Sequence, residues 1–190
     1  MRFHCARSLA VIVLFASLCA PSAWAQRMYT AYNMWYEKPD HLYAINYKKG
    51  TMIPAGTEVS DVGVSQDRRP MIVFTTVKDG QMFKVEFEEK YHPGFSLTDY
   101  TQKMFTSKSL SELTKGMSKE ETQAIKDGKL VVGMSKAAVI VAYGYPPEHA
   151  TANTESNRWT YWLDRFRKKV VYFNDAGRTR KPPADVANEL

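Results

Sequence analysis

Histidine, the side chain most often used in acid–base catalysis, is scarce in this chain. The chain has four histidines, of which His41, His92 and His149 lie beyond residue 25. None stands at a metal-ligand spacing from another histidine or a carboxylate. His41 and His92 lie beside prolines in expected turns, so we expect both to be exposed. A hydrolase that pairs one of them with a carboxylate is the weakest of three functional hypotheses.

Nucleophiles are equally poorly supported. No serine lies in a Gly-x-Ser-x-Gly context. Both cysteines, Cys5 and Cys19, lie near the N-terminus, so the rest of the chain has no thiol for catalysis, disulfides or metal binding. Glu86 and Glu88 share one face of an expected strand, which is most simply its solvated side. We therefore predict a protein that is not an enzyme and needs no cofactor.

The residues best suited to binding are aromatic and cationic. The connection between two expected strands, 159–162 and 170–173, contains Arg165-Phe166-Arg167-Lys168. Aromatic and arginine side chains are enriched at the energetic centres of protein interfaces. Two interpretations stay open: Phe166 contacts a partner, or it folds back onto the core.

Two further aromatic residues accompany this connection. Trp162 faces away from the expected helix-packing side of its strand, so either the preceding β region covers it or a partner does. Tyr145 lies directly after an expected helix end, which explains the neighbouring Gly144 but not the tyrosine. The predicted interaction residues are Tyr145, Trp162, Arg165, Phe166, Arg167 and Lys168.

Residues 1–25 have the pattern of a signal peptide. Arg2 and Arg7 precede a short apolar run over 8–20, and Ala23-Trp24-Ala25 matches a small-x-small cleavage site. An uncleaved anchor is the alternative. Export without disulfides is typical of a bacterial periplasm, so we predict periplasmic residence, with outer-membrane association left open.

Charge and hydropathy restrict the partners. Removing the signal peptide reduces the formal net charge from +6 to +4, which is mild, and the charges are interspersed. We therefore expect no nucleic-acid binding. No apolar run after residue 25 approaches bilayer-spanning length, so no membrane span is expected. The expected partners are envelope proteins, with peptidoglycan as an alternative.

Residues 26–95 show the pattern of a small β domain. A Pro-x-Gly-Thr turn lies at 54–57, and 71–77 is apolar and rich in β-branched residues. Asp79-Gly80 predicts a type I′ hairpin turn before an alternating strand over 83–87. About five short strands indicate a small antiparallel barrel or curled sheet. The spacing weakly resembles bacterial SH3-like barrels.

A short sequence repeat marks two helix starts. Gly-Met-Ser-Lys at 116–119 recurs at 133–136, and each serine is well placed as an N-cap. Ser118 has Glu121 three residues later and so can form a capping box, whereas Ser135 has Ala138 there. We predict helices over about 118–127 and 136–143, a helical linker over 96–115 and a disordered tail over 179–190.

The motifs of this part resemble the BamE (SmpA/OmlA) outer-membrane assembly family. The matching residues are Gly133-Met134-Ser135, Tyr143-Gly144-Tyr145-Pro146, Trp159-Thr160-Tyr161 and Val171-Tyr172-Phe173-Asn174-Asp175-Ala176-Gly177. The resemblance covers 116–178. It implies two helices packed on a three-stranded antiparallel sheet and a non-enzymatic role in binding envelope proteins.

These observations predict an α+β protein, in which a small antiparallel β-barrel-like domain precedes a two-helix, three-stranded BamE-like module. The predicted function is a periplasmic protein-interaction module of the bacterial envelope, in outer-membrane assembly or maintenance. The alternative is binding of cell-wall glycan or peptide through the β domain. In that case exposed aromatic faces would stack on sugars, the candidates being Tyr32, Trp35, Tyr43 and Tyr47.

Overall fold

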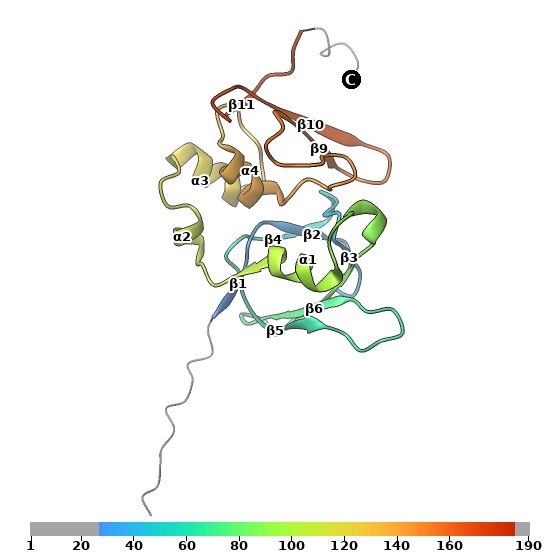
Figure 1. The fold of residues 1–190 in the computed structure, drawn as a ribbon. Helices are drawn as coiled ribbons and strands as arrows, with labels where there is room; N and C mark the ends of the chain where they lie inside the picture. Colours follow the sequence, from blue (N-terminus) through green and yellow to red (C-terminus); the bar gives the residue numbers. More distant parts are fainter. Residues whose placement is uncertain (1–26, 185–190) are drawn as a thin grey trace, which may run out of the picture.

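The computed structural model describes residues 27–184, so the predicted signal peptide and positions 185–190 of the predicted tail lie outside the described residues. The fold is mixed α and β, with a curled sheet below and a second sheet with two helices above it in Figure 1. The strands are β1 (Met28–Thr30), β2 (Met34–Tyr36), β3 (Leu42–Tyr43), β4 (Thr51–Ile53), β5 (Glu58–Val64), β6 (Ile72–Thr76), β7 (Met82–Glu86), β8 (Phe105–Thr106), β9 (Arg158–Trp162), β10 (Lys168–Phe173) and β11 (Thr179–Arg180). The helices are η1 (Glu89–Tyr91), α1 (Leu97–Met104), α2 (Leu110–Leu113), α3 (Lys119–Lys126) and α4 (Lys136–Tyr143).

The curled sheet has six strands in the order β3-β7-β6-β5-β1-β8. The prediction of an all-antiparallel sheet is wrong at one edge, because β3 pairs with β7 in parallel. The chain reaches that edge through the loop after β2, where the backbone N–H of Lys84 donates to the carbonyl of Pro39 (2.9 Å). β2 and β4 form a separate antiparallel pair.

The β6–β7 hairpin lies where Asp79-Gly80 predicted it, but its turn type differs. Gly80 has a φ of +67°, whereas Asp79 is not among the positive-φ residues, so the turn is not type I′. The N–H of Gly80 donates to the carbonyl of Thr76 (2.9 Å), and the Thr76 hydroxyl donates to Asp79 (2.5 Å). The aspartate therefore accepts a bond that stabilises a longer loop.

Of the residues predicted as a helical linker, 96–115, the first part up to residue 106 belongs to the curled sheet. Ser96 and Asp99 form a capping box that starts α1, and α1 buries Tyr100 and Met104 in the core of the curled sheet. The next residues form β8, which pairs with β1 at the sheet edge. Helical periodicity was visible in this segment, but the two-residue strand is too short to give a pattern of its own.

The helix pair α3–α4 is joined through one buried carboxylate. Glu121 accepts from the N–H of Ser118 (2.9 Å) and, with its other oxygen, from the N–H of Ser135 (2.7 Å). Arg178 also donates to it (3.0 Å). The carboxylate that Ser135 lacks in its own helix is therefore supplied by the preceding helix, so the two repeat copies share a single capping residue.

The second sheet has the order β11-β10-β9 and is antiparallel throughout. The prediction that the tail is disordered from residue 179 is wrong for Thr179 and Arg180, which form β11. Asn174 closes the turn before it, because its side-chain oxygen accepts from the N–H of Arg178 (2.9 Å). Buried Thr179 then donates to the carbonyl of Val131 (2.6 Å), which holds the strand in place.

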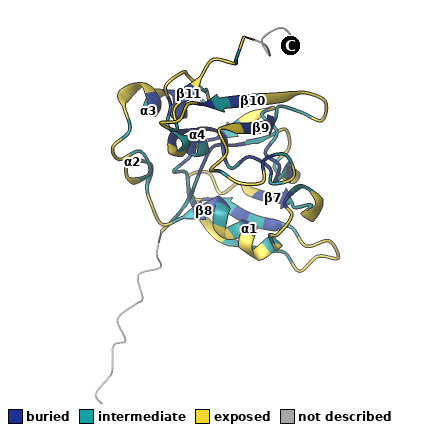
Figure 2. Ribbon diagram, turned by 45° about the horizontal axis from the view of Figure 1, so that its top comes forward, coloured by how far each residue is buried: buried dark blue, intermediate teal, exposed yellow. Residues whose placement is uncertain are grey.

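The six-stranded and the three-stranded sheet each have a hydrophobic core, and we call the parts built on them the first half (27–106) and the second half (110–180). Figure 2 shows the buried residues concentrated along both sheets and on the inner side of α4. No helix within residues 27–184 combines the length and apolar character needed to cross a bilayer.

The halves are joined by three polar side chains of the first half, which we call the clasp: buried Asn33 and Asn46, and half-buried Lys48, whose ammonium donates to the carbonyl of Tyr143 (2.6 Å). The Asn33 amide donates to the carbonyls of Ile125 (2.7 Å) and Ala142 (3.0 Å), at the ends of α3 and α4. Helix ends leave carbonyls without intrahelical partners. The clasp therefore caps two helices of one half from the other half.

Candidate protein-interaction surface

The β9–β10 turn is held in one conformation by a single carboxylate. Asp164 accepts from the N–H groups of Phe166 and Arg167, both at 2.9 Å, and from the guanidinium of Arg167 at 2.6 Å. These hydrogen bonds to the backbone of Phe166 and to Arg167 lower the pKa of Asp164 to about 2. The turn is therefore fixed at neutral pH by contacts within itself.

Phe166 projects from this turn into solvent, with 91% of its surface exposed. The interpretation in which it folds back onto the core is therefore wrong. An aromatic side chain that contributes nothing to the core, on a turn that is already ordered, is a feature of binding sites.

Trp162 and Lys168, which are directly opposite each other in the β9–β10 pair, are in contact. The Lys168 ammonium lies 4.4 Å from the Trp162 ring centre. The ring also stacks on His149 of the preceding loop, with centroids 6.1 Å apart. Trp162 is therefore partly covered, and the covering residue comes from the loop after α4.

The other two candidates, Arg165 and Tyr145, lie in different surroundings. The guanidinium of Arg165 lies 3.5 Å from the hydroxyl of Tyr43, so it links the turn to the first half. Tyr145 packs in the core of the first half, edge to face with Tyr32 (6.1 Å) and beneath the ammonium of Lys103 (4.4 Å). Tyr145 is thus explained by packing, whereas the other five candidates belong to β9, β10 and their connection.

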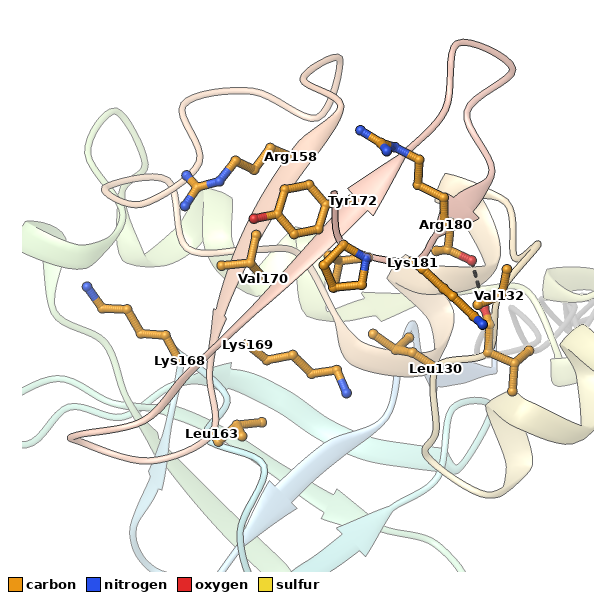
Figure 3. Close-up of a pocket in the computed structure, with 14 residues that line it drawn as sticks. Leu130, Val132, Arg158, Leu163, Lys168, Lys169, Val170, Tyr172, Arg180 and Lys181 are labelled. Carbon is orange, nitrogen blue, oxygen red and sulfur yellow. Dashed lines mark hydrogen bonds between the residues drawn. The ribbon is translucent and has the colours of Figure 1, made fainter. Parts of the chain in front are cut away.

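A groove beside β10 was not predicted. It has a volume of about 530 Å³ and is bounded by β10, the α3–α4 loop and the chain after β11 (Figure 3). Its cationic residues are Arg158, Lys168, Lys169, Arg180 and Lys181, and no carboxylate of residues 27–184 lines it. None of these five pairs with an acidic side chain within 27–184.

The apolar part of the groove comes largely from the α3–α4 loop. Val132 is 65% exposed and Val131 is 41% exposed, and both line the groove with Leu130. Across the groove, Tyr172 lies between Arg158 and Arg180 in register, with Arg180 near its ring (5.9 Å). The surface therefore combines apolar contact area with positive charge.

His92 overturns the expectation of an exposed loop histidine, because only 1% of it is exposed. Its Nδ1 lies 2.8 Å from Glu148, which also accepts from Lys103 (2.5 Å). Burial raises the pKa of Glu148, but the hydrogen bonds from His92 and Lys103 outweigh it and hold the pKa below its ordinary value. The cluster joins the two halves.

The geometry around the histidines offers no support for the hydrolase hypothesis. His92 and His41 each have a carboxylate neighbour, Glu148 for His92 and Glu86 for His41 (3.2 Å). However, Nε2 of His92 is buried, and no group of residues 27–184 lies within hydrogen-bond distance of it, so no nucleophile in this part of the chain is positioned against that atom. His41 is exposed and packs against Tyr43 (4.7 Å).

The four aromatic residues proposed for sugar stacking do not form one platform. Tyr32 is buried, with 2% exposed. Trp35 packs edge to face on Tyr143 (5.7 Å) and lies below Lys48 (4.5 Å). Only Tyr43 and Tyr47, an edge-to-face pair (5.3 Å), are half-buried at the surface without a role in either core.

Sequence reasoning found the turn because its residues are consecutive. The groove is built from three segments that only the fold brings together, and its one local signal was the apolar Val131-Val132 pair directly before a glycine. Comparison with known proteins adds no identification, because no family model, no curated protein and no solved structure matches this chain.

Proposed function

We propose that this chain is a non-enzymatic protein-interaction module of the bacterial cell envelope, acting in the periplasm in outer-membrane assembly or maintenance. One observation carries the interaction role: Phe166 is 91% exposed on a turn that Asp164 holds rigid. A pre-ordered turn reduces the entropy lost on binding, so the exposed ring is available as an anchor. Arg165 and Arg167 beside it are of the type enriched at interfaces.

The assignment to the envelope rests on the sequence. The signal-peptide pattern over 1–25 motivates periplasmic residence. The order α3, α4, β9, β10, β11 supports the proposed BamE-like arrangement of two helices and three antiparallel strands. The curled sheet of short strands is compatible with the proposed SH3-like resemblance of the first half. Fold likeness alone does not define a partner.

The experiment is site-specific photo-crosslinking in the native host, with a photoreactive residue at position 166. Position 82 is the matched control, because Met82 is also exposed (56%) but lies on the first half. We expect adducts with an envelope protein from position 166 that are absent from position 82. Arg167→Ala should reduce them severalfold, because it removes a cation and one contact that fixes the turn.

Two further measurements delimit the proposal. Fractionation and mass spectrometry of the mature protein test export and cleavage. Co-sedimentation with purified peptidoglycan tests the glycan alternative, in which Tyr43→Ala would reduce binding and Phe166→Ala would not. Identical adducts from positions 166 and 82 would contradict a specific interaction through the turn.

A further inference from the structure

In the described part of the chain, one edge of β10 has no strand beside it over most of its length. Backbone hydrogen bonds alternate between the two sides of an antiparallel strand. The N–H of Phe173 donates to Asn157, on the β9 side, at 2.8 Å. By this alternation, the N–H and C=O groups of Val170 and Lys168 point to the opposite side, into the groove. Within residues 27–184 no strand pairs with them there.

The chain itself prevents β11 from filling this edge. β11 pairs with the last two residues of β10, in the register Tyr172 to Arg180. Continuing that register would place Pro182 opposite Val170. Proline has no N–H to donate, and Pro183 follows it, so the ladder ends. The groove therefore lies along a strand edge that β11 cannot occupy.

We propose that this groove binds an extended acidic peptide segment of a partner protein, which adds a strand to β10 in line with β11. Strand addition at a sheet edge draws affinity from backbone hydrogen bonds and specificity from alternate side chains. In the described part of the chain the lining cations have no ion pairs and no carboxylate lines the groove, which favours a negatively charged ligand. This inference rests on the proposed function, in which the partner is a protein.

The register defines the peptide. Side chains opposite Lys168 and Val170 would lie on the face that carries Lys168, Arg158 and Tyr172, so acidic residues fit there. Side chains at the intervening positions would lie on the face of Val171, towards Leu130, so apolar residues fit there. The expected ligand therefore alternates acidic and apolar residues over about five positions.

The test uses the full mature chain and a fluorescein-labelled peptide of alternating Glu and Val, with an alternating Lys and Val peptide as control. Binding is measured by fluorescence anisotropy. We expect the Glu-Val peptide to bind at least tenfold more tightly than the Lys-Val peptide. Lys168→Glu combined with Lys169→Glu should weaken it about tenfold, and the matched pair Lys115→Glu and Lys119→Glu, outside the groove, should not.

Backbone pairing is tested on the ligand, so that folding is unaffected. Methylation of alternate peptide nitrogens should weaken binding at least tenfold in one register and less than twofold in the other. Equal effects in both registers, or equal binding of the two peptides, would overturn the proposal. So would binding to phosphatidylglycerol vesicles that the Glu-Val peptide does not displace, because lipid headgroups cannot extend a sheet.

The two proposals can fail separately. Absence of peptide binding, together with specific crosslinking at position 166, would refute only the strand-addition mode. Peptide binding that meets these criteria, without crosslinking at 166 in cells, would leave the groove assignment standing and refute the role of the turn.

Discussion

The clasp and the surface formed by the 164–167 turn and the groove, which we call the β10 surface, are both rich in polar groups, but their polar groups are paired to very different extents. Both ends of the Asn33 side-chain amide are hydrogen-bonded. Its NH₂ group donates to two helix-end carbonyls, and its oxygen accepts from the N–H of Ala55 (2.7 Å). Asn46 donates to Asn33 (3.0 Å) and Tyr143 (3.1 Å). Around β10, by contrast, the cations of the groove have no acidic partner in the described chain, and a strand edge and exposed apolar side chains lie beside them without a covering segment.

This difference in pairing indicates which region stabilises the fold and which is available for binding. Buried polar groups are costly unless they are satisfied, so a satisfied buried cluster is explained by the fold alone. Exposed groups that are aligned without partners are not explained by it. Changes at the clasp should therefore reduce the free energy of unfolding, whereas changes at the β10 surface should leave it intact and affect binding.

The largest effect is expected from Asn33→Ala. The substitution leaves the carbonyl of Ala142 and the N–H of Ala55 buried without these partners, while the carbonyl of Ile125 keeps its bond from the N–H of Gly128 (3.1 Å). Each unsatisfied buried group costs on the order of 1–3 kcal/mol, so we expect a loss of about 4 kcal/mol in urea unfolding. Asn153→Ala, which removes an exposed turn acceptor, is the control and should cost below about 1 kcal/mol. If Asn33→Ala cost no more free energy of unfolding than Asn153→Ala, the clasp would not be needed for stability.

Gly144→Ala should come next. Gly144 has a φ of +82° and a ψ of −179°, a region essentially restricted to glycine. An added Cβ would also lie 2.9 Å from both Asn46 and Tyr32. We expect a loss of about 3 kcal/mol by urea unfolding. Gly80 also has a positive φ but open space around it, so Gly80→Ala should cost only about 1 kcal/mol, from backbone strain alone.

Glu148→Gln tests the charged contact between the halves. The pKa of Glu148 is lowered by folding, so the stability that this group contributes is present above its unfolded pKa, near 4.5, and is lost as pH falls through the folded value. The variant should lose about 1–2 kcal/mol at pH 7 and show a shallower decline in stability below pH 4.5. Thermal unfolding from pH 3 to 8 measures both, and an unchanged acid dependence would argue against the contact.

The smallest effect on stability is expected from Phe166→Ser. The ring is exposed and packs on nothing in either core, so the free energy of unfolding should change by less than about 0.5 kcal/mol. Crosslinking of a neighbouring photoreactive position, 165, should nevertheless fall severalfold. A large loss of stability would mean that the ring packs on the protein in solution. The turn would then contribute to stability, as the clasp does, and the contrast between the two regions would not hold.

Local patterns in the sequence determined much of the framework. The alternation of Phe83 and Val85 gave β7 and its buried face, and Ser118 with Glu121 gave the start of α3. The turn at Phe166 was also found, because its residues are consecutive and its charges are local. These features depend on interactions within a few residues, which a single segment encodes.

Tertiary structure decided the rest. His92 is paired with Glu148 and Glu121 caps α4, through contacts 56 and 14 residues apart in the chain. Neither leaves a local pattern. The β10 groove exists only because β11 stops short of Val170 and the α3–α4 loop lies opposite. The sequence by itself determined most of the helices and the longer strands, whereas the packing of distant segments decided the short edge strands β8 and β11, which polar groups are buried and which edge remains open.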